Sequence, residues 1–187
     1  MGYTGGEKKF PTYHSLGNHT EALQIDFDSD VIGFEDVVEL FWNNHNPLRN
    51  GISRQYMAAV WYHDESQREI IENSREIVAS KFGGKVQTPV LPLDVFYLAE
   101  GYHQKYRLQQ QSSLMKQFAR MYSDASGFVD STAAARLNGF LYGYGRRELF
   151  DRETDGYGIP ADKLLQAISF RESSDTSETC SNGHCSI

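Results

Sequence analysis

The spacing of apolar and polar side chains changes along the chain from strand-like to helix-like. Residues 1–12 show no regular spacing and predict a loop. Residues 20–27 alternate between apolar and polar and predict a strand with one buried face. The inward side chains of that strand are expected to be Leu23, Ile25 and Phe27. Residues 33–43 carry apolar side chains at helical spacing, and residues 55–62 are apolar on both sides, as in an interior strand.

Two further elements follow in the first half of the chain. Asp64 is expected to cap a second helix that ends near the glycine pair at 83–84. A strand over 86–95 is interrupted by Pro89 and Pro92, which favours a position at the edge of a sheet. Strand, helix, strand, helix and strand in this order predict an α/β domain in which helices pack on a sheet in two layers.

From about residue 111 the apolar spacing is helical. Three successive stripes predict three helices, and Pro160 suits the first turn of the last one. Their apolar members are Leu114, Phe118 and Met121, then Leu137, Phe140 and Leu141, then Leu164, Leu165 and Ile168. The tail is rich in Ser, Thr and Asp and predicts a flexible segment. The sequence thus indicates a core over 1–110, a helical extension over 111–170 and a tail over 171–187.

Charge and composition narrow the classes of function. With 25 acidic and 18 basic side chains the formal charge is −7, and the absence of a basic stripe argues against binding to nucleic acid. No apolar run reaches the ~20 residues that span a bilayer, so we expect no membrane partner. The first residues have neither the basic start nor the apolar stretch of a secretory signal. We expect a cytoplasmic protein, or a mitochondrial one if a leader is missing.

The residues that commonly bind metals are scattered. No two of the six histidines have i, i+4 spacing on an expected helix, so hydrogen-bonding histidines are favoured over a metal site. Cys180, His184 and Cys185 offer three ligands for a soft metal, but on a flexible tail they would make a weak site. We therefore expect no metal and no other cofactor.

More informative polar residues are Glu21 and Tyr56, which open two of the expected strands, and Tyr13, which precedes the first of them. Tyr13 ends the motif Pro-Thr-Tyr, Glu21 ends His-Thr-Glu, and Tyr56 ends Gln-Tyr. The segment 96–104 adds a tyrosine, glutamate and histidine cluster after the edge strand. Taken singly, each has a structural explanation, because a tyrosine at a strand start is often a core residue with a hydrogen-bonded hydroxyl.

Together and in this order, the motifs resemble the methionine sulfoxide reductase A family, the peptide-methionine (S)-S-oxide reductases. The matching stretches are Gly2-Tyr3-Thr4-Gly5-Gly6, Pro11-Thr12-Tyr13, His19-Thr20-Glu21, Phe41-Trp42-Asn43-Asn44-His45, Gln55-Tyr56, Tyr62-His63-Asp64 and Phe96-Tyr97-x-Ala99-Glu100-x-Tyr102-His103-Gln104. The resemblance covers roughly residues 2–107, and the helical extension is similar to that of the longer animal branch. It implies a ferredoxin-like, split β-α-β-β-α-β core.

The resemblance also implies a mechanism for the repair of oxidised methionine under oxidative stress. A cysteine thiolate attacks the sulfur of methionine (S)-sulfoxide, an acid protonates the departing oxygen, and the resulting sulfenic acid is resolved by another cysteine and reduced by thioredoxin. By motif position Glu21 would be the proton donor, with a pKa raised by burial. Tyr13 and Tyr56 would donate hydrogen bonds to the sulfoxide oxygen. Cys180 and Cys185 would be the mobile resolving cysteines of a monomeric enzyme.

The chain departs from the family pattern at its start. The family's nucleophile lies in a Gly-Cys-Phe-Trp motif before the match to Gly2, where this chain has only Met1. We expect an N-terminally truncated chain that lacks the nucleophile, the first strand and the first helix, and that is inactive as given. Two alternatives stay open: a non-catalytic module that binds a sulfoxide or a protein, and a decayed or regulatory isoform. The short loop over 50–54 also leaves the tyrosine pair without the carboxylate that many members carry there.

Overall fold

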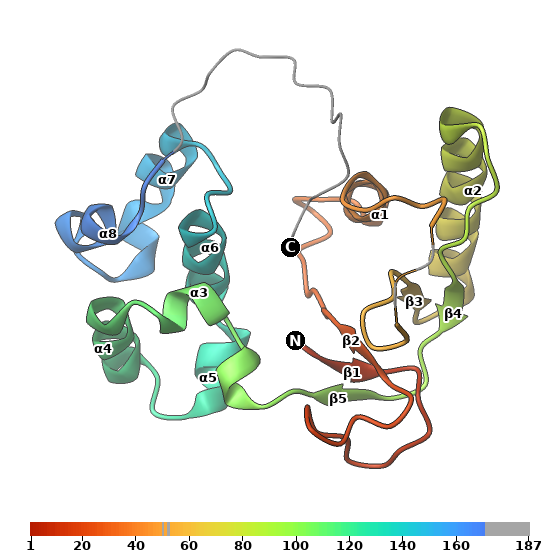
Figure 1. The fold of residues 1–187 in the computed structure, drawn as a ribbon. Helices are drawn as coiled ribbons and strands as arrows, with labels where there is room; N and C mark the ends of the chain where they lie inside the picture. Colours follow the sequence, from red (N-terminus) through yellow and green to blue (C-terminus); the bar gives the residue numbers. More distant parts are fainter. Residues whose placement is uncertain (50, 52, 171–187) are drawn as a thin grey trace. The chain divides into compact units, whose positions relative to one another are not determined.

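The computed structural model describes residues 1–49, 51 and 53–170, which belong to two compact units (Figure 1). The first unit is Met1–Gln104 and the second begins at Lys105. The sequence placed this boundary after residue 110. The difference arises because helix α3 (Tyr106–Gln109) packs on α6 (Thr132–Leu141), and its Leu108 is buried in the core of the second unit.

The first unit combines two small sheets with helices, which confirms the predicted α/β class (Figure 1). In one sheet β1 (Gly2–Thr4) lies between β2 (Thr20–Ala22) and β5 (Phe96–Leu98), antiparallel to both. In the other, β3 (Val60–Tyr62) is parallel to β4 (Val90–Pro92). The described residues therefore form two sheets where the sequence suggested one.

The start of the chain is a strand, so the prediction of a loop over residues 1–12 was wrong for its first part. β1 is too short for alternation to be visible, and it includes Gly2, which usually disfavours strands. The glycine is needed because a Cβ at that position would collide with the ring of Phe96 on the neighbouring strand. Strand β1 therefore depends on the close approach of two backbones, which only the tertiary structure reveals.

The predicted strands are shorter in the structure than in the sequence pattern. β2 ends at Ala22, and the side chains expected to face inward are instead exposed: Leu23, Ile25 and Phe27. Among the described residues β2 pairs within its sheet with β1 alone, so the ladder does not continue past Ala22, although the Phe27 ring stacks on that of Phe34. β3 likewise has one described neighbour and is not an interior strand, whereas the edge position expected for residues 86–95 fits β4.

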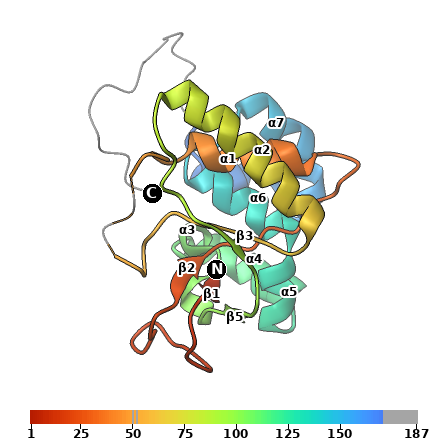
Figure 2. The same cartoon turned by 90° about the vertical axis from the view of Figure 1, so that its right-hand side faces the viewer.

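Two helices of the first unit agree with the prediction, α1 (Phe34–Asn43) and α2 (Glu65–Phe82). The carboxylate of Asp64 caps α2, and Gly83 ends it in the left-handed conformation, with φ 65°. The two helices lie side by side (Figure 2) and share a core cluster with β3 and β4. The buried members are Val38, Trp42, Ile71, Val78 and Val86. Trp42 Nε1 donates to Ser74 Oγ at 2.8 Å and joins the helices directly.

The second unit is helical and has a core of its own. The predicted helices appear as α4 (Ser112–Met121), α6 and α8 (Ala161–Ala167). The sequence missed α5 (Ala125–Asp130) and α7 (Arg147–Glu153), which are too short to show a full apolar stripe. The largest fully buried side chains of this core are Leu108, Leu114, Phe118, Leu137, Phe150 and Leu164. Two 3₁₀ turns, η1 (Gly101–His103) and η2 (Thr154–Tyr157), complete the two units.

The predictions for the tail fall outside the described residues. Cys180, His184 and Cys185 all lie in this segment, so neither the weak metal site nor the resolving cysteines can be placed. Within the described ranges, no three His, Cys, Asp or Glu side chains gather in a way that could hold a metal ion. The helices of those same ranges include none that is both long and apolar enough to cross a bilayer.

Candidate functional site

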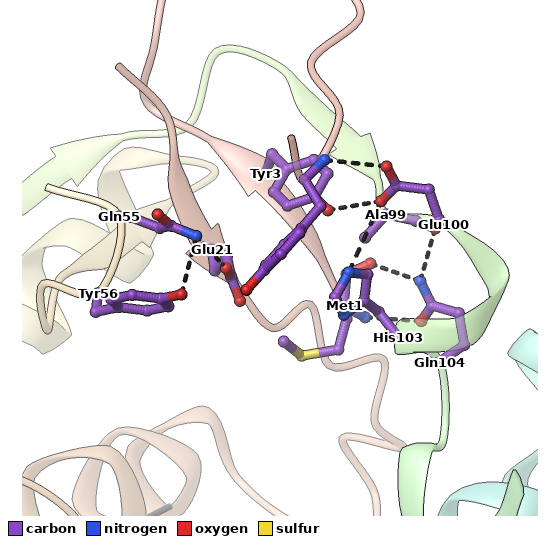
Figure 3. Close-up of polar contacts among 10 residues, drawn as sticks. Met1, Tyr3, Glu21, Gln55, Tyr56, Ala99, Glu100, His103 and Gln104 are labelled. Atoms are coloured by element: carbon purple, nitrogen blue, oxygen red, sulfur yellow. Dashed lines mark hydrogen bonds and ion pairs between the residues drawn. The ribbon is translucent and has the colours of Figure 1, made fainter. Parts of the chain in front are cut away.

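A chain of hydrogen bonds connects three side chains that are distant in the sequence. The side-chain amide of Gln55 donates to Glu21 Oε1 at 2.7 Å and to the Tyr56 hydroxyl at 3.0 Å (Figure 3). The Tyr13 side chain lies close enough to the Tyr56 hydroxyl to raise the pKa of Tyr56 above its usual value. The structure thus brings Glu21, Tyr56 and Tyr13 into one connected group, with Gln55 as the link that the sequence did not single out.

The segment that carries Tyr56 is held against β2 by main-chain contacts. The Glu21 N–H donates to the Gln55 carbonyl at 3.0 Å. The Thr20 hydroxyl donates to the Arg54 carbonyl at 2.8 Å. These two bonds join adjacent residues of β2 to adjacent residues before Tyr56. The position of the Tyr56 side chain beside Glu21 is therefore set by the backbone as well as by Gln55.

Arg54 anchors the same segment from its other side. Its guanidinium donates to the carbonyl oxygen of Gly5 at 2.6 Å and to that of Asn18 at 3.1 Å. The positively charged Arg54 thus holds the short loop before Tyr56 in place. From the sequence we expected only that this loop lacks a carboxylate to support Tyr13 and Tyr56. Nothing in the sequence indicates this role, because the acceptors are main-chain carbonyls that every residue possesses.

The group lies open to solvent at one end. Tyr56 is 60% exposed, whereas Glu21 and Tyr13 are half-buried. A ligand can therefore reach Tyr56 from solvent, while Tyr13 and Glu21 remain partly shielded. Two phenol hydroxyls can stabilise developing negative charge on an oxygen atom, and a neighbouring carboxyl group can supply a proton to it.

A second cluster supports Tyr13 from the side of β1. The Tyr3 hydroxyl donates to Glu100 Oε2 at 2.6 Å (Figure 3). The Tyr13 N–H donates to Glu100 Oε1 at 3.0 Å. The bond from Tyr3 and then that from Tyr13 lower the pKa of Glu100 to about 2. Burial, followed by the contact with this carboxylate, raises the pKa of Tyr3. The ring of His103 lies 5.0 Å from that of Tyr13 and completes the support.

The low pKa of Glu100 predicts a loss of stability in acid. The carboxyl group titrates near 4.5 in the unfolded chain and near 2 in the folded one, so folding favours its ionised form. This contribution is complete above pH 4.5 and disappears as the pH falls towards 2. Urea unfolding of the first unit at a series of pH values, followed by tryptophan fluorescence, should show this decline. Glu100→Gln should flatten it, and an identical slope in both proteins would contradict the prediction.

Two of the described histidines, His19 and His45, are hydrogen-bonded through both ring nitrogens. His19 Nδ1 accepts the Gly6 N–H at 3.1 Å, while its Nε2 lies 2.8 Å from the Lys8 carbonyl. The two ring nitrogens of His45 contact the Phe41 carbonyl and Thr88 Oγ1, each at 2.8 Å. Burial lowers the pKa of His45 and favours its neutral form. Both rings are thus occupied in holding the backbone and neighbouring side chains.

The sequence of this chain is similar to those of known proteins. A family model described as "Peptide methionine sulfoxide reductase" matches residues 1–136. The peptide methionine sulfoxide reductase of Drosophila melanogaster is 38% identical over 161 residues, which are 85% of this chain and 64% of that protein. The MsrA protein of Methanothermobacter thermautotrophicus is 38% identical over 117 residues, 57% of this chain and 69% of that protein.

The fold is also similar to that of a solved structure. The reduced form of Mxr1 from Saccharomyces cerevisiae superimposes with a TM-score of 0.55 at 24% identity, over 59% of this chain and 70% of that chain. The match to the Drosophila protein extends beyond the range of the family model, which agrees with the longer animal branch. This chain spans less than two thirds of the length of that relative.

Proposed function

Because this chain belongs to the peptide methionine sulfoxide reductase family, we propose that Glu21, Tyr13 and Tyr56 bind and protonate the oxygen of methionine (S)-sulfoxide. The observation that carries the proposal is the hydrogen-bonded group in which Gln55 links the carboxylate to the phenol pair. The segments that supply these residues are separate in the sequence, and the fold brings their functional atoms together. The substrate would be the sulfoxide in proteins or as the free amino acid.

Each group in the site has a distinct part in this proposal. The sulfoxide oxygen carries partial negative charge, so it would accept hydrogen bonds from Tyr13 and Tyr56 that strengthen as the S–O bond breaks. Glu21 would supply the proton as the oxygen departs. Since Gln55 donates to Oε1 of Glu21, the other carboxyl oxygen remains available to carry that proton. Gln55 would therefore orient the acid as well as join it to Tyr56.

Reduction of the sulfoxide also requires a thiolate, which becomes a sulfenic acid when the oxygen leaves the methionine sulfur. Residues 1–179 contain no cysteine. The resemblance implies a nucleophile in a Gly-Cys-Phe-Trp motif ahead of Gly2, with Cys180 and Cys185 resolving the sulfenic acid and thioredoxin reducing the disulfide. We propose that a polypeptide of these 187 residues retains the oxygen-binding half of the site and does not complete the reaction.

Binding and turnover can be separated with the polypeptide as it stands. N-acetyl-methionine (S)-sulfoxide amide should shift the NMR signals of Tyr13 and Tyr56, because their hydroxyls would turn towards the sulfoxide oxygen. Dithiothreitol or thioredoxin should produce no methionine. Tyr56→Phe removes one hydroxyl and should weaken binding by about tenfold, the effect of one lost hydrogen bond.

The stereoisomer and the parent thioether provide matched controls. The (R)-sulfoxide and methionine itself should leave the tyrosine signals almost unchanged, since neither presents an oxygen to both phenols in the same way. Steady production of methionine from the (S)-sulfoxide by the 187-residue polypeptide would show that another group supplies the nucleophile. Equal binding of sulfoxide and thioether would remove the basis for the assigned hydrogen bonds.

A further inference from the structure

We infer that Glu100 is the positioning residue for the tyrosine pair: its carboxylate fixes the backbone at Tyr13 and thereby sets the distance between the Tyr13 and Tyr56 hydroxyls. This inference rests on the proposed function, because the distance between the two hydroxyls matters for activity only if both bind the sulfoxide oxygen. The contact between the two phenols, however, can be measured without any sulfoxide. Glu100 would touch neither the substrate nor the reacting atoms, and would act through Tyr13.

The carboxylate joins the strand core to the loop that carries Tyr13. Oε2 accepts from Tyr3, which lies on the central strand β1 and is 1% exposed. Oε1 accepts from the backbone N–H of Tyr13. Tyr13 belongs to no helix or strand, and the local pairing around it is an isolated bridge between Thr12 and Ser15. Glu100 therefore transfers the rigidity of the sheet to the residue that carries the phenol.

The position of Glu100 itself is determined by the turn that follows. It precedes the 3₁₀ turn η1, and its carbonyl accepts the His103 N–H at 2.9 Å. The same turn places the His103 ring against the Tyr13 ring, with their centroids 5.0 Å apart. One short segment thus holds both the backbone and the side chain of Tyr13. Such support on two sides leaves the Tyr13 hydroxyl little freedom to move away from Tyr56.

An ionised carboxylate is well suited to this position, and an amide is not. Both neighbours, the Tyr3 hydroxyl and the Tyr13 N–H, are donors, so the side chain between them must offer two acceptors. Hydrogen bonds to an ionised acceptor are stronger than neutral ones, and the low pKa of Glu100 is consistent with the charge. Glutamine at this position would set its NH₂ group opposite one of the donors. The Tyr3 hydroxyl can rotate to accept from that NH₂ group, but the Tyr13 N–H would then donate to a neutral oxygen, so its bond would be weaker and longer.

The decisive measurement is the titration of Tyr56 in the whole 187-residue polypeptide labelled with ¹³Cζ-tyrosine, with Tyr56→Phe used for assignment. The contact with Tyr13 raises the pKa of Tyr56 above its ordinary value of 10.0. Glu100→Gln should return that pKa towards 10.0, because the two hydroxyls separate. Glu7→Gln is the matched control: it makes the same substitution at an exposed position of the same unit and should leave the Tyr56 pKa raised.

Two further measurements test the inference if Glu100→Gln does not fold. Glu100→Asp retains the charge but shortens the reach by one methylene, so it too should lower the Tyr56 pKa. In the unaltered protein the Tyr13 amide should exchange with solvent more slowly than that of exposed His14. A folded Glu100 variant with an unchanged Tyr56 pKa, or rapid exchange at Tyr13, would overturn the inference.

Sulfoxide binding separates this inference from the proposed function. If the (S)-sulfoxide does not bind but the Tyr56 pKa responds to Glu100→Gln, the positioning role stands and the proposed function fails. If the sulfoxide binds with equal affinity to the unaltered protein and to a folded Glu100→Gln variant, the positioning role fails and the proposed function stands. We expect Glu100→Gln to weaken binding by about tenfold, comparable to the loss of one hydrogen bond.

Discussion

Glu21→Gln is expected to reduce the rate of sulfoxide reduction by about 10²–10⁴-fold, the usual contribution of a positioned general acid. Glutamine occupies nearly the same volume but has no acidic proton to give to the departing oxygen. The experiment needs a polypeptide that contains the thiol, so we would join a family segment with the Gly-Cys-Phe-Trp motif ahead of Gly2. The amount of methionine formed from the (S)-sulfoxide with dithiothreitol as reductant would measure the rate.

A matched control distinguishes the loss of the Glu21 proton from the effect of removing any one carboxylate charge. Glu7→Gln makes the same substitution at an exposed position of the same unit and should leave the rate unchanged. Full activity of Glu21→Gln in the extended polypeptide would show that another group is the proton donor.

Phe150→Ala is expected to lower the free energy of unfolding of the second unit by about 3–5 kcal/mol, the range for removing a buried aromatic side chain. Phe150 is completely buried and lies edge-on to Phe140 at 5.3 Å and to Phe170 at 5.2 Å between ring centroids. Alanine would leave a cavity among these rings, because the surrounding residues can move into the empty space only in part. Urea unfolding followed by circular dichroism would measure the change.

The same variant also tests whether the two units unfold separately, which we expect because each has a core of its own. Both tryptophans, Trp42 and Trp61, lie in the first unit, so their fluorescence reports that unit alone. It should be unaffected by Phe150→Ala while the circular dichroism transition moves to lower urea. Tyr144→Ala, at a position that is 64% exposed in the second unit, should change stability by about 0.5 kcal/mol or less. An equal shift in fluorescence and circular dichroism would indicate one cooperative unit.

The sequence by itself determined the long helices, the α/β class and the order of short motifs that indicated the family. Helices α1, α2, α4, α6 and α8 were predictable because a helix closes its hydrogen bonds within four residues, so its periodicity is local. The family motifs were likewise contiguous stretches. The Asp64 cap of α2 was visible for the same reason, since its partner Gln67 is three residues away.

The tertiary structure alone decided the sheet and the support of the candidate site. β1 was missed and β2 was overextended, because pairing depends on a neighbouring strand that alternation cannot identify. Tyr13, Glu21 and Tyr56 were singled out by their motifs, but their link through Gln55 was not. The roles of Gln55 and Glu100 depend on bonds to residues 34, 87 and 97 positions away. Such contacts leave no periodic trace in a sequence, because only the folded backbone determines which distant side chains meet.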